Sequence, residues 1–207
     1  MAQHRIIAKR IALFTACYSV FFLLHAIYDD NYEFILYSFV LLFLLLALTY
    51  IYRRVELSTW IVVPLSLFGF LHLLGGNWHI NGVRLYDIPF FGGVIHFDNV
   101  VHTIGVFIVT VILYNLLFPF IDQRVKDRYI IFYFLIILMA LGIGSVNDII
   151  ELIAVLFFNA SKGVGNYLNN AFDIVFNALG ATLAVTVIHV SLAKQRKLKL
   201  LGEISKE

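Results

Sequence analysis

Long apolar runs separated by short polar segments make up most of the chain. Each run has the length of roughly 20 residues that an α-helix needs to cross the hydrocarbon core of a bilayer. The pattern predicts helices at about 11–28, 33–52, 58–75, 99–119, 129–157 and 171–192. We therefore expect an all-α, polytopic membrane protein in which residues 1–207 form a single bundle of about six transmembrane helices.

Two segments depart from this simple alternation. In the fifth run, Gly142, Gly144 and Ser145 precede polar residues and predict an irregularity within one span. The loop at 76–98 combines Pro89 and paired glycines with the aromatic residues Trp78, Tyr86, Phe90 and Phe91. Because aromatic rings prefer the membrane interface, this loop is expected to fold against the bundle there, either as a lid or as a connector.

Composition and charge support a membrane protein. Hydrophobic residues make up 61% of the chain and charged residues 14%, against about 25% charged in soluble domains. The net charge of +2 is dispersed along the chain and gives no reason to expect a nucleic-acid partner.

Cys17 is the only cysteine, so disulfide frameworks and CxxC zinc sites are excluded. No small-residue cleavage site follows the first run, which is expected to stay as a span.

Lysine and arginine positions predict the orientation. With a cytoplasmic N-terminus, thirteen of the 15 basic residues fall on the cytoplasmic side, and only Arg84 and Lys162 fall outside. This positive-inside bias requires an even number of spans and places both termini in the cytoplasm. Asn159 begins an Asn-Ala-Ser glycosylation acceptor on the outer side, but such short matches are common, and its modification is left open.

The polar residues inside the predicted spans gather at one depth, near the outer side. They are His72 in the third helix, Asp98 and His102 in the fourth, Asp148 and Glu151 in the fifth, and Asp173 and Asn177 in the sixth. Three pairs share a helix face by i, i+4 spacing: Asp98 with His102, Asn147 with Glu151, and Asp173 with Asn177. On the sixth helix the same face continues through Gly180 and Ala184, so the polar face is expected to be the packed face.

An acidic side chain deep in a span costs about 2.5–3.5 kcal/mol on insertion scales, so a whole group needs partners, water, protons or a cation. The candidate metal ligands are His72, Asp98, His102 and Asp173. Imidazole with carboxylate suits Zn, Fe or Mn and does not choose among them. Glu151 or Asp148 is the candidate general base. The candidate supporting residues are Asn147, Asn177, His79 and His96, the last out of phase with the inward face.

Several short motifs occur in a recognisable order: "LHLLGG" (71–76), "GVRLYDIP" (82–89), "HFDNVVHTIG" (96–105), "NDIIE" (147–151) and "GNYLNNAFDIVFNALGA" (165–181). Over about residues 55–190 the chain resembles the YjdF-type family of small bacterial inner-membrane proteins. Members of that family pair an L-H-x-x-G helix end with an Asp-x-x-x-His helix start, a later Glu and a final Asp-rich helix. The D-x-x-x-N-x-x-G-A stretch is more loosely similar to VanZ-like proteins.

The resemblance implies a multi-pass protein of a bacterial or archaeal plasma membrane. It also implies functional roles for His72, Asp98, His102, Glu151, Asp173 and Asn177, but no reaction. At one point the chain departs from the family, because Asn147 precedes Asp148 where an aromatic-flanked acidic pair is expected.

Three functions stay open from the sequence. The first is a metal-binding or catalytic site that acts on a lipid or a lipid-linked envelope substrate reached from the outer leaflet. The second is a small ion- or proton-coupled transporter, and the third is a non-catalytic scaffold in which the polar residues only fix helix packing. A serine nucleophile motif, a P-loop and HExxH are absent from the sequence. Whether the protein is an enzyme, and its oligomeric state, are left open.

Overall fold

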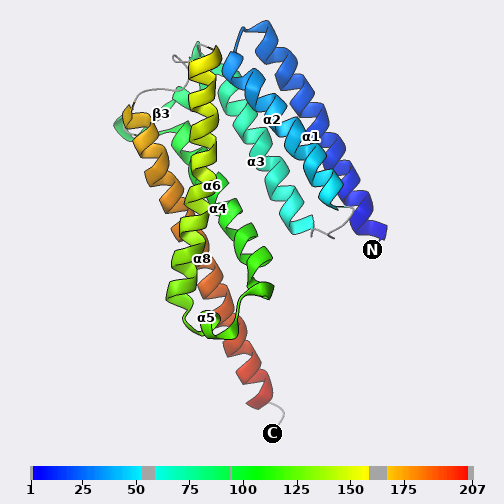
Figure 1. Cartoon of the computed structure of the whole chain (residues 1–207), viewed down its shortest axis with the longest axis vertical. Helices are drawn as coiled ribbons and strands as arrows, with labels where there is room; N and C mark the ends of the chain where they lie inside the picture. The colour runs from blue at the N-terminus through cyan, green and yellow to red at the C-terminus, as the bar shows by residue number, and fades with distance from the viewer. Residues whose placement is uncertain (1, 53–58, 94, 159–166, 205–207) are drawn as a thin grey trace.

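The computed structural model describes residues 2–52, 59–93, 95–158 and 167–204. Nearly all of these residues are helical, which confirms the predicted all-α membrane fold (Figure 1). The helices are α1 (Ala2–Tyr28), α2 (Tyr32–Tyr52), α3 (Thr59–Asn77), α4 (Phe97–Leu117), α5 (Gln123–Asp127), α6 (Tyr129–Phe158) and α8 (Tyr167–Ile204). The glycosylation acceptor at Asn159 lies outside the described residues.

Six apolar helices correspond to the six predicted spans. Four of them are long and apolar enough to cross a membrane: Ile6–Tyr28, Phe97–Phe120, Tyr129–Phe158 and Tyr167–Gln195. Two shorter apolar helices cover Tyr32–Ala47 and Ile61–Asn77. In Figure 1 the last residues of α1, α3 and α6 and the first residues of α4 and α8 all lie toward the top, which corresponds to the outer side predicted from charge.

Three helix details differ from the sequence-based expectation. Helix α1 begins at Ala2 instead of residue 11, and α8 continues to Ile204, well past residue 192. Both extensions contain strong helix formers such as Ala, Leu, Lys and Arg, and neither contains a proline. The irregularity expected at Gly142 to Ser145 is absent, because α6 is one continuous helix.

The helices form two groups of three that meet along one seam. Helices α1, α2 and α3 pack together, as do α4, α6 and α8, and the groups meet where α4 lies on α3 and α6 lies on α2. The most extensive contact joins α4 to α8. At this contact a Cβ atom added to Gly180 would lie 2.3 Å from the backbone oxygen of Thr103, so only glycine permits this approach.

In the loop between α3 and α4, the residues around Tyr86 pack against both helices. Strand β1 (His79–Ile80) pairs antiparallel with β2 (Val83–Arg84), and β3 (Pro89–Phe90) pairs with β4 (Ile95–His96). Two 3-10 turns, η1 (Leu85–Asp87) and η2 (Phe91–Gly93), complete it. The turn of the first hairpin is Asn81-Gly82, with φ of 53° and 80°, the positive values that a two-residue hairpin requires.

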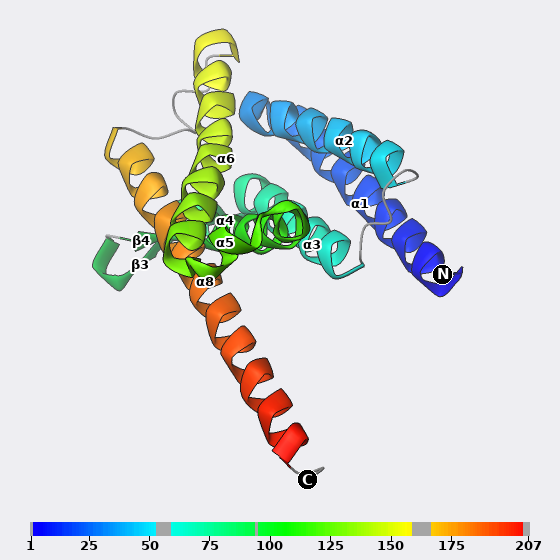
Figure 2. The same ribbon diagram turned by 60° about the horizontal axis from the view of Figure 1, so that its bottom comes forward.

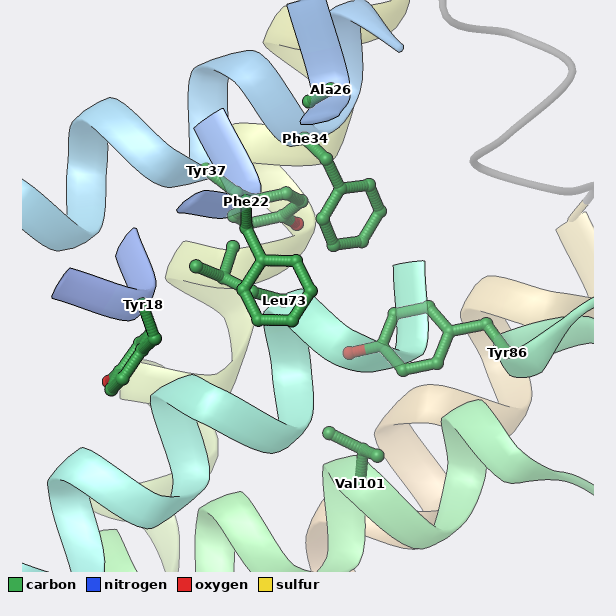
Figure 3. Packing of buried hydrophobic residues seen from close by; sticks show 8 residues of the cluster. All are labelled: Tyr18, Phe22, Ala26, Phe34, Tyr37, Leu73, Tyr86 and Val101. Carbon is green, nitrogen blue, oxygen red and sulfur yellow. The ribbon is translucent and has the colours of Figure 1, made fainter. Parts of the chain in front are cut away.

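Two side chains hold this loop to the helices. Tyr86 is 5% exposed, and Figure 3 shows it reaching from the loop toward α3, beside Phe34. The Nη1 atom of Arg84 lies 3.3 Å from Oε2 of Glu33 on α2. Burial alone would lower the pKa of Arg84, but its hydrogen bonds with Asp87 and the nearby carboxylates raise it, so this side chain stays charged.

We predict opposite membrane sides for the α1–α2 turn and the end of α8. In a Cys17→Ser background, Asp29→Cys should react with a membrane-impermeant maleimide in right-side-out vesicles, because Asp29 is exposed at the outer end of α1. Lys197→Cys should react only after the vesicles are permeabilised. Labelling of both positions, or of Lys197→Cys alone, before permeabilisation would contradict the predicted orientation.

Candidate metal centre

The outer ends of α4 and α8 bring Asp98, His102 and Asp173 together. One ligand atom from each residue lies within 4.8 Å of the other two. The Nε2 atom of His102 is 3.6 Å from Oδ1 of Asp98 and 3.7 Å from Oδ1 of Asp173. The side chains of Asp98, His102 and Asp173 are 18%, 10% and 1% exposed. Three of the four predicted metal ligands therefore form one buried cluster.

Helical spacing explains why these residues meet. Asp98 and His102 are one turn apart on α4, so both side chains point toward the same neighbour. That neighbour is α8, where Asp173 occupies the first turns, on the same face as Gly180. The close backbone contact at Gly180 allows side chains from the two helices to reach one another at the outer end.

Asparagine side chains hydrogen-bond all three residues of the cluster and orient them. The Nδ1 atom of His102 is 3.1 Å from Oδ1 of Asn177. An amide oxygen can only accept, so Nδ1 is the donor in this contact, and Nε2 is the ring nitrogen that faces the two carboxylates. Asn99 donates to Oδ1 of Asp173 at 3.3 Å, and Asn169 donates to Oδ2 at 3.2 Å. Asn169 also hydrogen-bonds Asp98.

Two of these asparagines were not among the predicted site residues. Asn169 precedes Asp173 by four residues, so extending the i, i+4 pattern one turn toward the N-terminus would have identified it. Asn99 shares a face with His102 by i, i+3 spacing. It was overlooked because the adjacent Asp98 was taken as the polar residue of that turn. The predicted supporting role of Asn177 agrees with its contact to His102.

Glu151 lies beside this cluster and is held by two donors. The hydroxyl of Tyr37 on α2 donates to Oε1 of Glu151 at 3.2 Å, and Asn147 donates to the same oxygen at 2.8 Å. Glu151 is 8% exposed and interacts electrostatically with Asp98 and Asp173. The structure shows no hydrogen bond from a described residue to the other carboxylate oxygen, Oε2.

Asp148, the other predicted base, has one carboxylate oxygen that lacks a partner. Its Oδ1 atom is buried without a hydrogen bond from the residues that the structure describes. His102 and Asp98 are its electrostatic neighbours. A buried carboxylate oxygen without a donor is costly, and a bound water or cation is the usual way to satisfy it.

His72, the fourth predicted ligand, lies outside the three-residue cluster. Its Nδ1 atom is 2.6 Å from the hydroxyl of Tyr86, and its ring lies perpendicular to that of Tyr37, with centroids 4.4 Å apart. His102 is its electrostatic neighbour. Burial and nearby carboxylates raise the pKa of Tyr86 well above its usual range, so the contact with His72 is made by a neutral phenol.

The remaining predicted histidines lie at the edge of the site. His96 precedes α4, and its backbone N–H donates to Oδ1 of Asn99 at 2.9 Å. His79 is exposed on β1 and belongs to none of the metal-ligating groups found among the described residues. Sequence reasoning missed four residues near the site: Tyr37, Tyr86, Glu33 and Arg84. The two tyrosines were missed because tyrosine was counted as apolar. The ion pair was missed because Glu33 and Arg84 are 51 positions apart.

Below the site the packing between α4, α6 and α8 is mostly apolar. Val106, Ala140 and Ala181 pack together one turn further in, and Tyr114, Phe132, Ile136 and Val185 follow. Thr110 is buried at this level, and its hydroxyl donates to a carbonyl of its own helix, that of Val106. Within the described parts of α4, α6 and α8, the ionisable cluster thus stops in the outer half.

The fold and the site define a polytopic helical membrane protein with a buried histidine–carboxylate cluster near one end of its bundle. Residues 10–194 match a family model described as "Predicted membrane protein (DUF2238)". The chain belongs to this family. No curated protein and no solved structure matches the chain.

We predict that Gly180→Ala disrupts the site by separating α4 from α8. The added methyl would overlap the backbone of Thr103, and overpacking of this kind costs about 1–3 kcal/mol. Thermal unfolding in detergent, followed by circular dichroism, should show a lower midpoint than wild type. Gly142→Ala is the matched control, since a Cβ there meets nothing within 4 Å, and its midpoint should not fall. Equal midpoints for both variants would contradict the close contact.

Proposed function

We propose that Asp98, His102 and Asp173 bind a divalent transition metal ion, Zn, Fe or Mn, and that the protein uses this ion to act on a lipid or lipid-linked envelope substrate. The observation that carries the proposal is the clustering of three ligand atoms within 4.8 Å inside an apolar bundle. We further propose that residues 1–207 form one domain and that the protein is a YjdF-type protein of a bacterial or archaeal plasma membrane.

The spacing of the ligand atoms supports metal binding. Metal–ligand bonds of about 2.0–2.2 Å in a tetrahedral site separate the ligand atoms by about 3.4 Å. The two distances from Nε2 of His102 are 3.6 Å and 3.7 Å, and all three ligand atoms lie within 4.8 Å of one another, so a bound ion would draw them closer together. Two carboxylates also match the charge of a divalent ion, which removes the cost of burying them unpaired.

The orientation of the His102 ring supports the same proposal. A histidine that binds a metal through one ring nitrogen usually donates its other N–H to an oxygen. Asn177 supplies that oxygen at Nδ1 and leaves Nε2 facing the two carboxylates. Asn99 and Asn169 fix Asp173 in the same way without adding charge.

The neighbouring carboxylates suit proton transfer. When bound, the ion would supply Lewis acidity and lower the pKa of a water molecule at the site. Glu151 is the proposed general base, since Tyr37 and Asn147 both bind Oε1 and orient the carboxylate. Asp148 is the alternative base, because its Oδ1 atom lacks a described donor.

The position of the cluster near one end of the bundle suggests the substrate class. The cluster comes from the first turns of α4 and α8, the ends that the charge pattern predicts to be outer, so lipid head groups of the outer leaflet would be within reach. A transporter needs polar groups across the whole membrane, and the apolar packing of Val106, Ala140 and Ala181 beneath the site argues against that alternative. The experiment below distinguishes metal binding from a scaffold in which the polar network only fixes helix packing.

We predict that the purified protein contains a divalent transition metal and that Asp98→Asn, Asp173→Asn and His102→Ala each lose it. Each change removes one of three ligand atoms, and the loss should approach the full stoichiometry measured by elemental analysis. The matched control is His25→Ala, which removes a histidine 3.2 Å from Asp29 at the same end of the bundle. Its metal content should equal that of wild type.

Folding is checked on the same samples. Circular dichroism and gel filtration in detergent should show that the three ligand variants keep the helical fold. Well-folded wild-type protein that stays free of metal after supplementation with Zn, Fe and Mn would overturn the proposed metal site and favour the scaffold.

We predict that the lipid extract of cells producing the wild-type protein differs from that of cells producing Glu151→Gln. The amide keeps the shape of the side chain and can still bind Tyr37, but it cannot take up a proton. Mass spectrometry of the two extracts should show a species consumed or formed only with wild type. Metal content should be unchanged in this variant, and identical extracts would count against the proposed catalytic role of Glu151.

A further inference from the structure

The loop between α3 and α4 carries an unusual number of exposed apolar side chains. Trp78, Ile80, Val83 and Phe90 are 47%, 46%, 44% and 39% exposed. The loop's attachments to the bundle are made by other residues, above all by Tyr86 and Arg84. A fixed loop in water would normally present polar side chains outward, so these four residues need a partner.

The position of the loop indicates where that partner lies. It begins at the outer end of α3 and leads directly into α4, and the N–H of Trp78 still bonds the carbonyl of Leu74. In Figures 1 and 2 the β3–β4 hairpin lies to the side of the bundle, near the outer part of α8, at the level of the helix ends. The β3–β4 hairpin thus extends sideways at the end of the bundle where the charge pattern predicts the lipid head groups of the outer leaflet.

The chemistry of the exposed residues matches a lipid surface. Tryptophan and other aromatic side chains prefer the boundary between head groups and acyl chains. In the first turns of α4, which follow the loop directly, Val100 and Ile104 are also 38% and 37% exposed. The polar Asn81-Gly82 turn and the charged Asp87 are exposed in the same loop, so its surface is amphipathic, as an interfacial segment requires.

We propose that the two hairpins, β1–β2 and β3–β4, form an anchor in the outer leaflet of the membrane. The anchor keeps η1 against the bundle and thereby keeps Tyr86 in contact with His72. The loop is accordingly a fixed part of the site's outer wall and does not swing away as a lid. The partner is the lipid interface itself, and the inference does not depend on the proposed metal or reaction.

Tryptophan fluorescence tests the anchor, because the chain has only two tryptophans, Trp60 and Trp78. The full chain with Trp60→Phe, or Trp60→Tyr if that folds better, reports Trp78 alone in phosphatidylcholine vesicles. We expect brominated lipids to reduce its emission, and more strongly when the bromine is near the head group than when it is near the chain end. Aqueous iodide should reduce it less than it reduces the emission of free tryptophan amide.

Two outcomes overturn the anchor. Iodide quenching equal to that of the free amide, without quenching by lipid, places the loop in water. Protection from both quenchers places Trp78 against protein, such as a second copy of the chain. The matched control is Trp78→Phe, which leaves Trp60 near the other end of α3 and shows how much quenching arises without Trp78. The measurement succeeds or fails equally with metal-free protein, so it is independent of the proposed function.

Discussion

The close approach of α4 and α8 is the constraint on which the site depends. Gly180 faces the backbone of Thr103, and the hydroxyl of Thr103 lies 3.4 Å from the carbonyl oxygen of Phe176 on α8. Side chains as short as aspartate can meet across two helices only when the backbones approach in this way. The 3.7 Å distance from His102 on α4 to Asp173 on α8 follows from this contact, whereas the 3.6 Å distance from His102 to Asp98 is set by one turn of α4.

Amides and a phenol hydrogen-bond the acidic groups of the site, Asp98, Asp173 and Glu151. Asn99, Asn169 and Asn177 bind the cluster itself, while Tyr37 and Asn147 bind Glu151. Amide and phenol donors satisfy carboxylate oxygens but do not neutralise their charge. A bound cation would supply the positive charge that these amide and phenol donors do not.

The site also joins the two halves of the molecule. Tyr37 and His72 come from the first three helices, and their partners Glu151 and Tyr86 come from α6 and from the loop before α4. The buried hydrophobic residues drawn in Figure 3, which include Tyr37 and Tyr86, pack together at this seam. Polar contacts that cross a seam between packed helices fix how the halves align, because a shift of either half leaves a buried group unpaired.

The sequence by itself determined the helices, the depth of the polar residues and most of the cluster. Length and hydropathy suffice for the spans because backbone hydrogen bonds must be satisfied inside each helix in lipid, and i, i+4 spacing placed Asp98 with His102 on one face. Only the tertiary structure decided that His72 bonds Tyr86 and lies apart from the cluster, and that Tyr37 holds Glu151. These contacts join residues 14 and 114 positions apart, and such pairings depend on how helices pack, which no local pattern along the chain records.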